Sequence, residues 1–166
     1  MISKTVSEAT LARFAKEVAK YPADQKQSAV MACLAIVQQE TGYVSTDSEK
    51  VVADYLGMAP IAVHEVTTFY NMYNQHACGK YKLNVCTNLP CQLRDGGRAL
   101  KHLEEKLGIS MGETTPDGLF TLQQCECLGA CADSPVLLVN DRTMCSFMTD
   151  EKLDQLVDGL RAAGDK

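Results

Sequence analysis

The sequence predicts an α+β protein with an N-terminal helical bundle over residues 1–76 and a second domain of mixed strands and helices over residues 77–166. One observation is the helical spacing of apolar residues in the first half. Another is the change near "NQHACGKYK", after which strand-like runs alternate with helical ones. A third is the total of eight cysteines, of which all but Cys33 lie within residues 77–166. A length of 166 residues allows one substantial core or two small ones.

Four helices are expected in the first half, within residues 7–22, 23–42, 46–57 and 59–73. Apolar residues recur at helical spacing in the first two, and Pro22 and Gly42 mark their ends. In the third, Thr46 has the position of an N-cap and Glu49 stands three residues on, the spacing of a capping box. Pro60 occupies the expected first position of the fourth helix. The pair of short helices around "YLGMAPIAVHEV" also resembles a helix-turn-helix.

The second half has the order strand, helix, strand, strand, helix. "KYKLNVC" alternates like a strand, with Tyr81, Leu83 and Val85 on one side. A helix in "RDGGRALKHLEEKLG" precedes the strand-like runs "LFTLQQC", "PVLLVND" and "RTMCSFM", and "TDEKLDQLVDGLRAAG" closes the chain as a helix. One crossover helix in this order predicts a small open sheet resembling thioredoxin.

Composition excludes several classes of function. A net charge of −5 removes the phosphate attraction on which nucleic-acid binding depends, so we expect no nucleic-acid partner. The longest apolar run, "AVMACLAIV", is too short to cross a bilayer, and no direct membrane insertion is expected. The N-terminus has no hydrophobic signal core, which favours a cytoplasmic location. Thiols stay reduced there, so eight cysteines indicate that some hold a metal.

Two pairs of cysteines have the spacing of metal ligands: Cys86 and Cys91, and Cys127 and Cys131. Each pair lies just after a predicted strand. Loops that follow strands at the same edge of a sheet converge, so the four sulfurs can meet. Four thiolates can bind zinc or an iron–sulfur cluster. The gaps of four and three residues favour [2Fe–2S] over zinc, and disulfides or free thiols remain as alternatives.

Spacing alone does not settle the third ligand. Cys125 could replace Cys127, because both face the same side of an extended strand. Gly129 lacks a Cβ, so its backbone can approach a ligand sulfur and donate an N–H hydrogen bond, although an ordinary turn glycine is the alternative. Glu126 and Asp133 oppose the addition of an electron, so we expect a low reduction potential. The remaining thiols, Cys33, Cys78 and Cys145, are expected in core or inert positions.

Three segments together resemble a known family: "VTTFYNMY", "VCTNLPCQLRDGG" and residues 106–141, which end in "CECLGACADSPVLLVND". The chain is similar over nearly its whole length to the 24 kDa-type, or E, subunit of respiratory complex I, NADH:quinone oxidoreductase. Its signature is matched in register by Asp117, Phe120, Thr121, Cys127, Leu128, Gly129 and Cys131. Ser134 departs from the Gly or Ala usual before the proline of that signature, a change that bears on a local hydrogen bond and not on ligation.

The resemblance implies a thioredoxin-like [2Fe–2S] ferredoxin domain after the helical bundle. It implies that Cys86, Cys91, Cys127 and Cys131 hold the cluster, so Cys127 is chosen over Cys125. It further implies an electron-transfer subunit that exchanges single electrons with a flavin. FMN and NADH would then lie on a partner, the 51 kDa-type subunit, and other peripheral-arm subunits would complete a complex on the cytoplasmic side of the inner membrane.

No complete active site is expected in this chain itself. The sequence has no G-x-G-x-x-G motif after a strand and no P-loop, and no acid–base constellation is evident, so catalytic residues are not predicted. His64, His76 and His102 are interpreted as structural or solvated. The enzyme would be NADH:quinone oxidoreductase as a whole, and hydride chemistry would belong to the partner subunit.

Two alternative functions would use the same cysteines, one in a different enzyme complex and one without redox chemistry. An equivalent subunit of an NAD-reducing hydrogenase or an NAD-dependent formate dehydrogenase would use the same cluster in another complex. A zinc-stabilised interaction module would use the thiols without redox chemistry. The stretch "VTTFYNMY" is a candidate docking surface for the partner, and packing between the two domains is its alternative role.

Overall fold

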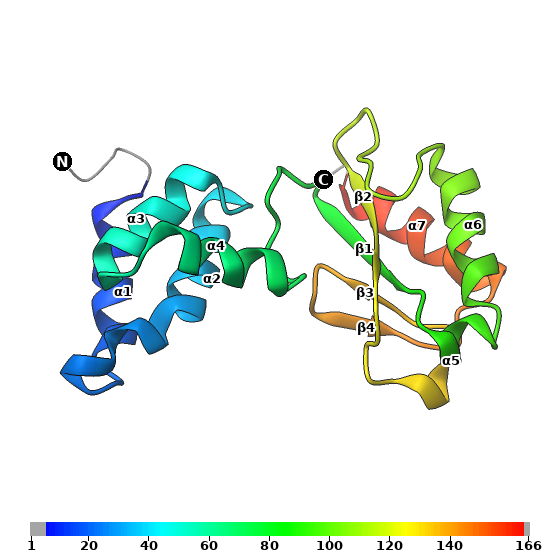
Figure 1. Cartoon of the computed structure of the whole chain (residues 1–166). Helices are drawn as coiled ribbons and strands as arrows, with labels where there is room; N and C mark the ends of the chain where they lie inside the picture. Colours follow the sequence, from blue (N-terminus) through cyan, green and yellow to red (C-terminus); the bar gives the residue numbers. More distant parts are fainter. Residues whose placement is uncertain (1–5, 165–166) are drawn as a thin grey trace. The chain divides into compact units, whose positions relative to one another are not determined.

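The computed structural model describes residues 6–164. The chain divides into two compact units, of which the first ends at Ala77 and the second begins at Cys78 (Figure 1). Each unit has its own hydrophobic core, so each can be described by itself. Among residues 6–164, no helix is both long enough and apolar enough to cross a membrane.

The first unit is a bundle of helices. Its elements are α1 (Glu8–Val18), the 3-10 segment η1 (Ala23–Ala29), α2 (Val30–Thr41), α3 (Thr46–Leu56) and α4 (Pro60–Phe69). Their apolar faces meet in a core that includes the fully buried Phe14, Leu34 and Val52. Gly42 and Gly57 end α2 and α3 with left-handed backbone angles that glycine adopts without strain. The predicted bundle is confirmed in its order and in these two ends.

Two details of the bundle were predicted wrongly. The N-cap of α3 is Ser45, not Thr46, and the Ser45 hydroxyl accepts the Ser48 amide at 3.2 Å. This places Glu49 one position beyond a capping box, and its carboxylate lies instead 3.0 Å from His64 Nδ1. Residues 23–42 are also not one helix, because η1 contains non-helical angles at Gln25 before α2 begins. The polar side chains of residues 24–28 are exposed, so no packing favours a longer helix there.

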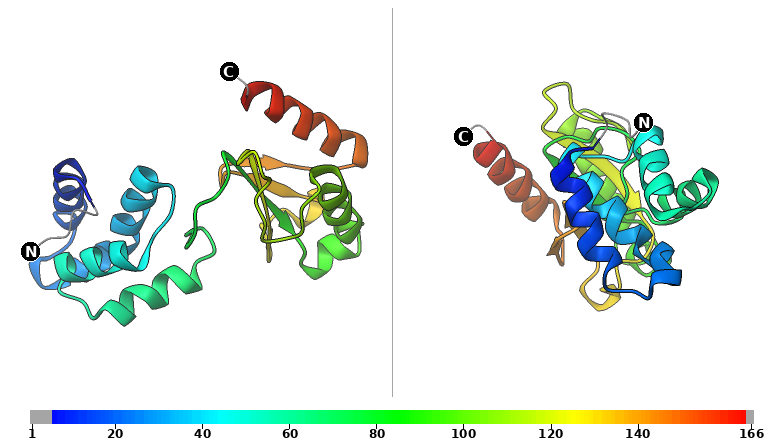
Figure 2. Two further views of the ribbon diagram at one scale, coloured as in Figure 1. Left: turned by 90° about the horizontal axis from the view of Figure 1, so that it is seen from above. Right: turned by 90° about the vertical axis from the view of Figure 1, so that its left-hand side faces the viewer.

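The second unit is a four-stranded sheet with helices on one face, which confirms the α+β class (Figures 1 and 2). Its elements are β1 (Tyr81–Cys86), α5 (Leu89–Gln92), α6 (Gly96–Leu107), β2 (Phe120–Cys125), η2 (Cys131–Asp133), β3 (Leu137–Val139), β4 (Thr143–Cys145) and α7 (Asp150–Gly164). The strand order is β2-β1-β3-β4. The pair β1–β2 is parallel, as a helical crossover requires, and the other pairs are antiparallel.

The core of the second unit lies between the sheet and the helices α6 and α7. Leu83 and Val85 of β1 point into it, as the alternation predicted, together with Leu122 of β2. The two helices are also joined by ion pairs, such as Lys106 Nζ to Asp154 Oδ1 at 3.3 Å, and His102 Nε2 lies 3.0 Å from the same oxygen. The charged ladder between them contains Arg98, His102 and Lys106 on α6 and Asp150, Asp154 and Asp158 on α7.

Gly96 sets how closely the start of α6 approaches Cys91. Gly96 is buried, and a Cβ added to it would lie 2.8 Å from both the carbonyl carbon and the carbonyl oxygen of Cys91. These are backbone atoms, which cannot move aside as a side chain would. The next residue, Gly97, differs: a Cβ there would meet only the end of the flexible Gln92 side chain. The glycine at position 96 therefore maintains the loop that carries Cys91.

Gly96→Ala is expected to lower the free energy of unfolding by about 1–3 kcal/mol, the usual cost of overpacking a filled site. Gly97→Ala is the matched control, since it adds the same methyl group beside a side chain that can shift, and alanine favours helix. Denaturant unfolding of the two variants measures the difference. Equal stability of both variants would show that the Cys91 loop can move away from α6.

Candidate functional site

The predicted ligand cysteines lie at one end of the sheet. The strands β1 and β2 are parallel and in register, so that Cys86 is opposite Cys125 where both strands end. The loops that leave these two residues therefore start side by side. Figure 1 shows α5 and the segment between β2 and β3 at this same end of the sheet.

The first pair of cysteines is buried. Cys86 and Cys91 are 2% and 1% exposed, and the single turn of α5 brings Cys91 back toward the end of β1. The Cys86 thiol donates to the Glu126 carbonyl oxygen at 2.8 Å, which ties β1 to the loop after β2. The Cys91 sulfur lies 3.2 Å from the Ser134 hydroxyl. Burial is the main cause that raises the pKa of the Cys86 thiol.

The second pair is exposed. The sulfurs of Cys127 and Cys131 lie 3.8 Å apart, and their mutual hydrogen bond is the main cause that raises the pKa of Cys131. Between them, Gly129 has a φ of +74°, and its amide donates to the Cys127 sulfur at 3.3 Å. The predicted amide-to-sulfur hydrogen bond from Gly129 is thus confirmed.

The spacing of this pair fits two ligands of one tetrahedral metal ion. With metal–sulfur bonds of about 2.3 Å, two thiolates on the same tetrahedral ion lie about 3.8 Å apart. Zinc and iron both meet that condition, so the distance does not choose between them. Within the described part of the chain, no group of three or more His, Cys, Asp or Glu side chains is arranged to hold a metal ion. The four predicted ligands instead form two pairs of free thiols, one buried and one exposed.

The structure separates Cys125 from Cys127, which the sequence pattern did not. Cys125 is 7% exposed and packs in a small cluster with Cys86, Cys91 and Val136. Its burial raises the pKa of its thiol to about 12. Because β2 ends at Cys125, the alternation of an extended strand does not continue to Cys127, which lies exposed in the loop.

Three residues of the family signature build the fold at the other end of β2. Asp117 accepts the Leu119 amide at 2.9 Å, and the Thr115 hydroxyl is the main cause that lowers the pKa of this carboxyl group. Phe120 is fully buried in the core. Thr121 accepts the Gly79 amide at 2.6 Å. These residues shape the strand that leads to the cysteines.

The Glu126 carbonyl was missed from the sequence as a partner of Cys86, and Ser134 was expected to bear on a local hydrogen bond but its partner Cys91 was not named. A backbone acceptor has no sequence signal. Ser134 did have one, since it departs from the small apolar residue that the resemblance predicts. The other cysteines match their predicted roles in part: Cys33 is fully buried, whereas Cys78 and Cys145 are only partly buried.

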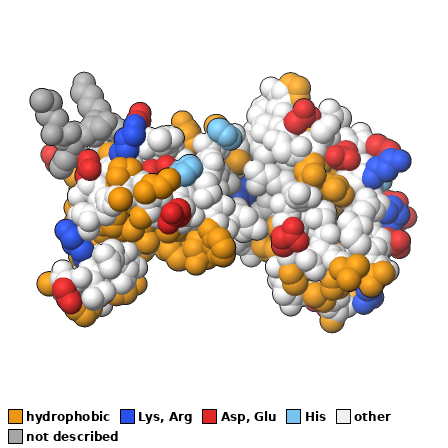
Figure 3. Space-filling model, in the orientation of Figure 1, with side chains coloured by type: hydrophobic (Ala, Val, Ile, Leu, Met, Phe, Trp, Pro, Cys, Tyr) orange, Lys and Arg blue, Asp and Glu red, His pale blue; other side chains and the backbone are white. Residues whose placement is uncertain are grey.

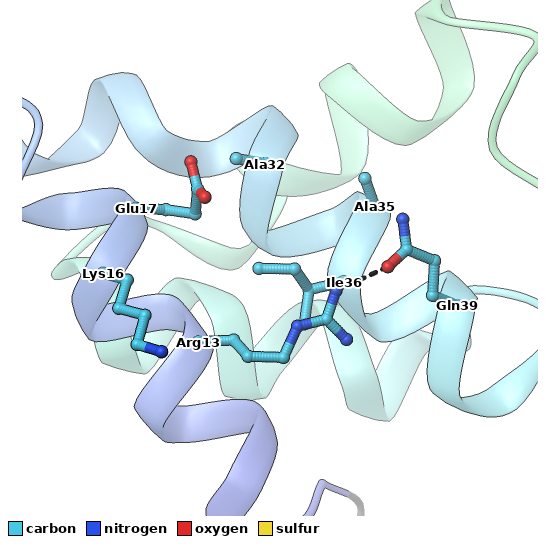
Figure 4. Close-up of a pocket in the computed structure, with 7 residues that line it drawn as sticks. All are labelled: Arg13, Lys16, Glu17, Ala32, Ala35, Ile36 and Gln39. Carbon is cyan, nitrogen blue, oxygen red and sulfur yellow. Dashed lines mark hydrogen bonds between the residues drawn. The ribbon is translucent and has the colours of Figure 1, made fainter.

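The helical unit contains a separate pocket of about 440 Å³ between α1 and α2 (Figure 4). Its rim includes Arg13 and Glu17 from α1, and Arg13 donates to the Gln39 side chain of α2. No cysteine lines it. His64 and His102 contact carboxylates and not the thiols: His64 lies against Glu49, and His102 against Asp154.

Comparison with known proteins shows which cofactor this architecture serves. The family model of the thioredoxin-like [2Fe–2S] ferredoxin matches residues 14–161. The chain is 42% identical over 144 residues to NADH-quinone oxidoreductase subunit 2 of Thermus thermophilus. This alignment covers 87% of this chain and 80% of that protein. The chain is also 39% identical over 145 residues to the E subunit of NADH-quinone oxidoreductase from Rickettsia conorii, covering 87% and 86%.

Solved structures agree on the fold. A chain of an NAD⁺-reducing [NiFe]-hydrogenase superposes with a TM-score of 0.68 over 81% of this chain, at 17% sequence identity. The match covers only 22% of the hydrogenase chain, so this chain spans about a fifth of it. At that identity the likeness concerns the fold alone. From the family match and the long alignments with curated relatives, the chain belongs to the thioredoxin-like [2Fe–2S] ferredoxins.

Proposed function

We propose that this chain is the electron-transfer subunit of the NADH dehydrogenase module of an NADH:quinone oxidoreductase. The observation that carries this proposal is the 42% identity to a subunit of that enzyme over 80% of the relative's length. The pairing of thiols at one sheet edge supports it from within the molecule. The enzyme is the whole complex, and this chain supplies one redox centre of it.

Cys86, Cys91, Cys127 and Cys131 are the proposed ligands of the [2Fe–2S] cluster. A cluster bound there supplies a centre that takes up or releases one electron at a time. The chain itself provides four thiolates, a backbone amide at Gly129 that donates to a ligand sulfur, and burial of one ligand pair. Cys125 contributes a buried thiol beneath the site and is not a ligand in this proposal.

The partner is proposed to be a flavin- and NADH-binding subunit of the 51 kDa type, with other peripheral-arm subunits around it. NADH gives up two electrons together, whereas a [2Fe–2S] cluster accepts one, so a flavin must stand between them. The complex would hold this chain at the cytoplasmic side of the inner membrane. Membership of a multi-subunit complex also fits the hydrogenase neighbours, which support the alternative host only through a shared fold.

The C-terminal end of α4 offers a surface for such a partner. Within residues 66–73, Thr67 and Tyr73 are buried. Phe69, in contrast, is 80% exposed, and Met72 is 45% exposed. Large apolar side chains that are exposed together often mark a site of protein–protein contact. Figure 3 shows that hydrophobic side chains gather in patches among scattered charges on the face drawn in Figure 1. We propose that Phe69 and Met72 contact the partner subunit.

The ligand assignment predicts that Cys127→Ser loses most of the bound iron and acid-labile sulfide, since a hydroxyl is a poor substitute for a thiolate. Cys125→Ser is the matched control two residues away and is expected to keep the cluster. Iron and sulfide analysis of both purified chains, with their visible absorption, makes the comparison. Loss of the cluster only in the Cys125 variant would reverse the assignment.

The redox role predicts a red-brown chain with an iron-to-sulfide ratio near one. A zinc-stabilised module would be colourless, because zinc has no partly filled d shell. Affinity purification of the tagged chain from its host is then expected to bring down a flavoprotein that oxidises NADH. A colourless zinc protein contradicts the cluster, and recovery with hydrogenase or formate dehydrogenase subunits contradicts the proposed host.

The docking proposal predicts that Phe69→Ser reduces co-purification of the flavoprotein without changing thermal stability. Thr68→Ser, at the neighbouring exposed position, is the control and is expected to have no effect. Assembly is measured by the yield of the flavoprotein per mole of this chain. Normal assembly of a stably folded Phe69 variant would remove the docking role of this surface.

A further inference from the structure

Ser134 connects the two halves of the cysteine site. Its side chain is only 3% exposed, and its hydroxyl oxygen lies 3.2 Å from the Cys91 sulfur of the buried pair. The same hydroxyl donates to the backbone carbonyl of Cys131, in the exposed pair, at 2.8 Å. Ser134 therefore contacts one proposed ligand through its sulfur and another through its backbone.

The hydrogens at this serine can be counted. A hydroxyl has one hydrogen to donate and two lone pairs with which to accept. While Cys91 is a thiol, its S–H can donate to Ser134 and the Ser134 hydroxyl can donate to the Cys131 carbonyl, so every group is satisfied. A thiolate ligand at Cys91 has no hydrogen. With the hydroxyl still turned to the carbonyl, two electron-rich atoms would then face each other at 3.2 Å.

Rotation of the hydroxyl removes this conflict. Hydrogen bonds in which one partner is charged are stronger than neutral ones, so the thiolate competes well for the single hydrogen. The Cys131 carbonyl loses a partner in exchange. Because Cys91 is 1% exposed and Ser134 is 3% exposed, water has little access to the Cys91 sulfur as an alternative donor.

We propose that Ser134 is a positioning residue whose hydroxyl donates a hydrogen bond to the ligated Cys91 sulfur and thereby raises the reduction potential of the cluster. The inference rests on the proposed role of Cys91 as a ligand. Hydrogen bonds to cluster sulfurs are among the factors that set the potential, because they stabilise the extra negative charge of the reduced state. A chain with Ala or Gly at this position would lack the donor.

The test is a potentiometric titration of the full chain with its cluster, followed by visible absorption and by electron paramagnetic resonance of the reduced form. Ser134→Ala is expected to keep its iron and to have a more negative midpoint potential. At the midpoint of the unmodified chain, its ratio of oxidised to reduced cluster should rise at least threefold, which corresponds to about 28 mV at 59 mV per tenfold change.

Two further variants test whether a change in potential is due to the loss of the Ser134 hydroxyl. Ser134→Thr retains the hydroxyl and should restore a ratio close to that of the unmodified chain. Ser146→Ala is the matched control, because it removes a nearby hydroxyl that contacts Asp133 at 3.4 Å, and it should leave the potential unchanged. An unchanged potential in Ser134→Ala, with the cluster present, overturns the proposal and shows that the hydroxyl stays with Cys131.

If Ser134→Ala loses the cluster, the potential of Ser134→Cys is measured in its place, because the S–H of cysteine is a weaker donor than a hydroxyl. The proposal then requires a lower potential for the Cys variant than for the Thr variant, and equal potentials contradict it. Cys91→Ser separates this inference from the ligand assignment. A normal cluster in that variant refutes the proposed ligation, whereas cluster loss there with an unchanged Ser134→Ala potential refutes the role of Ser134 alone.

Discussion

The parallel, in-register pairing of β1 with β2 is the constraint on which the rest of the site depends. It ends both strands at the same edge, with Cys86 opposite Cys125. Cys86 and Glu126 are 40 positions apart in the chain, yet the Cys86 thiol reaches the Glu126 carbonyl at 2.8 Å because of this pairing. The crossover helix α6 makes a parallel pair possible, and its start at Gly96 packs directly on the Cys91 backbone. Sheet, crossover and thiols are therefore parts of one arrangement.

The site has a buried half and an exposed half, and this asymmetry gives each half a different physical role. Cys86 and Cys91 lie inside a small apolar cluster, where little water screens their charge. Cys127 and Cys131 lie at the surface, where a partner protein can come close to whatever they bind. Ser134 and the hydrogen bond from Cys86 to the Glu126 carbonyl both connect the two halves. A centre that is buried on one side and accessible on the other suits the exchange of single electrons with a partner.

Much of the fold was predictable because its signals are local. Apolar spacing gave the helices and strands, and Gly42 and Gly57 gave two helix ends. The errors came where several residues offered the same signal: Ser45 and Thr46 can both cap a helix, and it is the Ser45 hydroxyl that accepts the Ser48 amide. Similarly, strand alternation put Cys125 and Cys127 on one side, but the strand ends between them. The start of the two cysteine loops at the same edge of the sheet followed from topology, whereas the Glu126 and Ser134 contacts depend on loop geometry that no spacing records.

Iron X-ray absorption of the purified, loaded chain measures whether its four thiolates hold two iron atoms. We expect each iron to have four sulfur neighbours and one neighbouring iron. Nitrogen or oxygen in the first coordination shell, or an iron without an iron neighbour, would contradict this expectation.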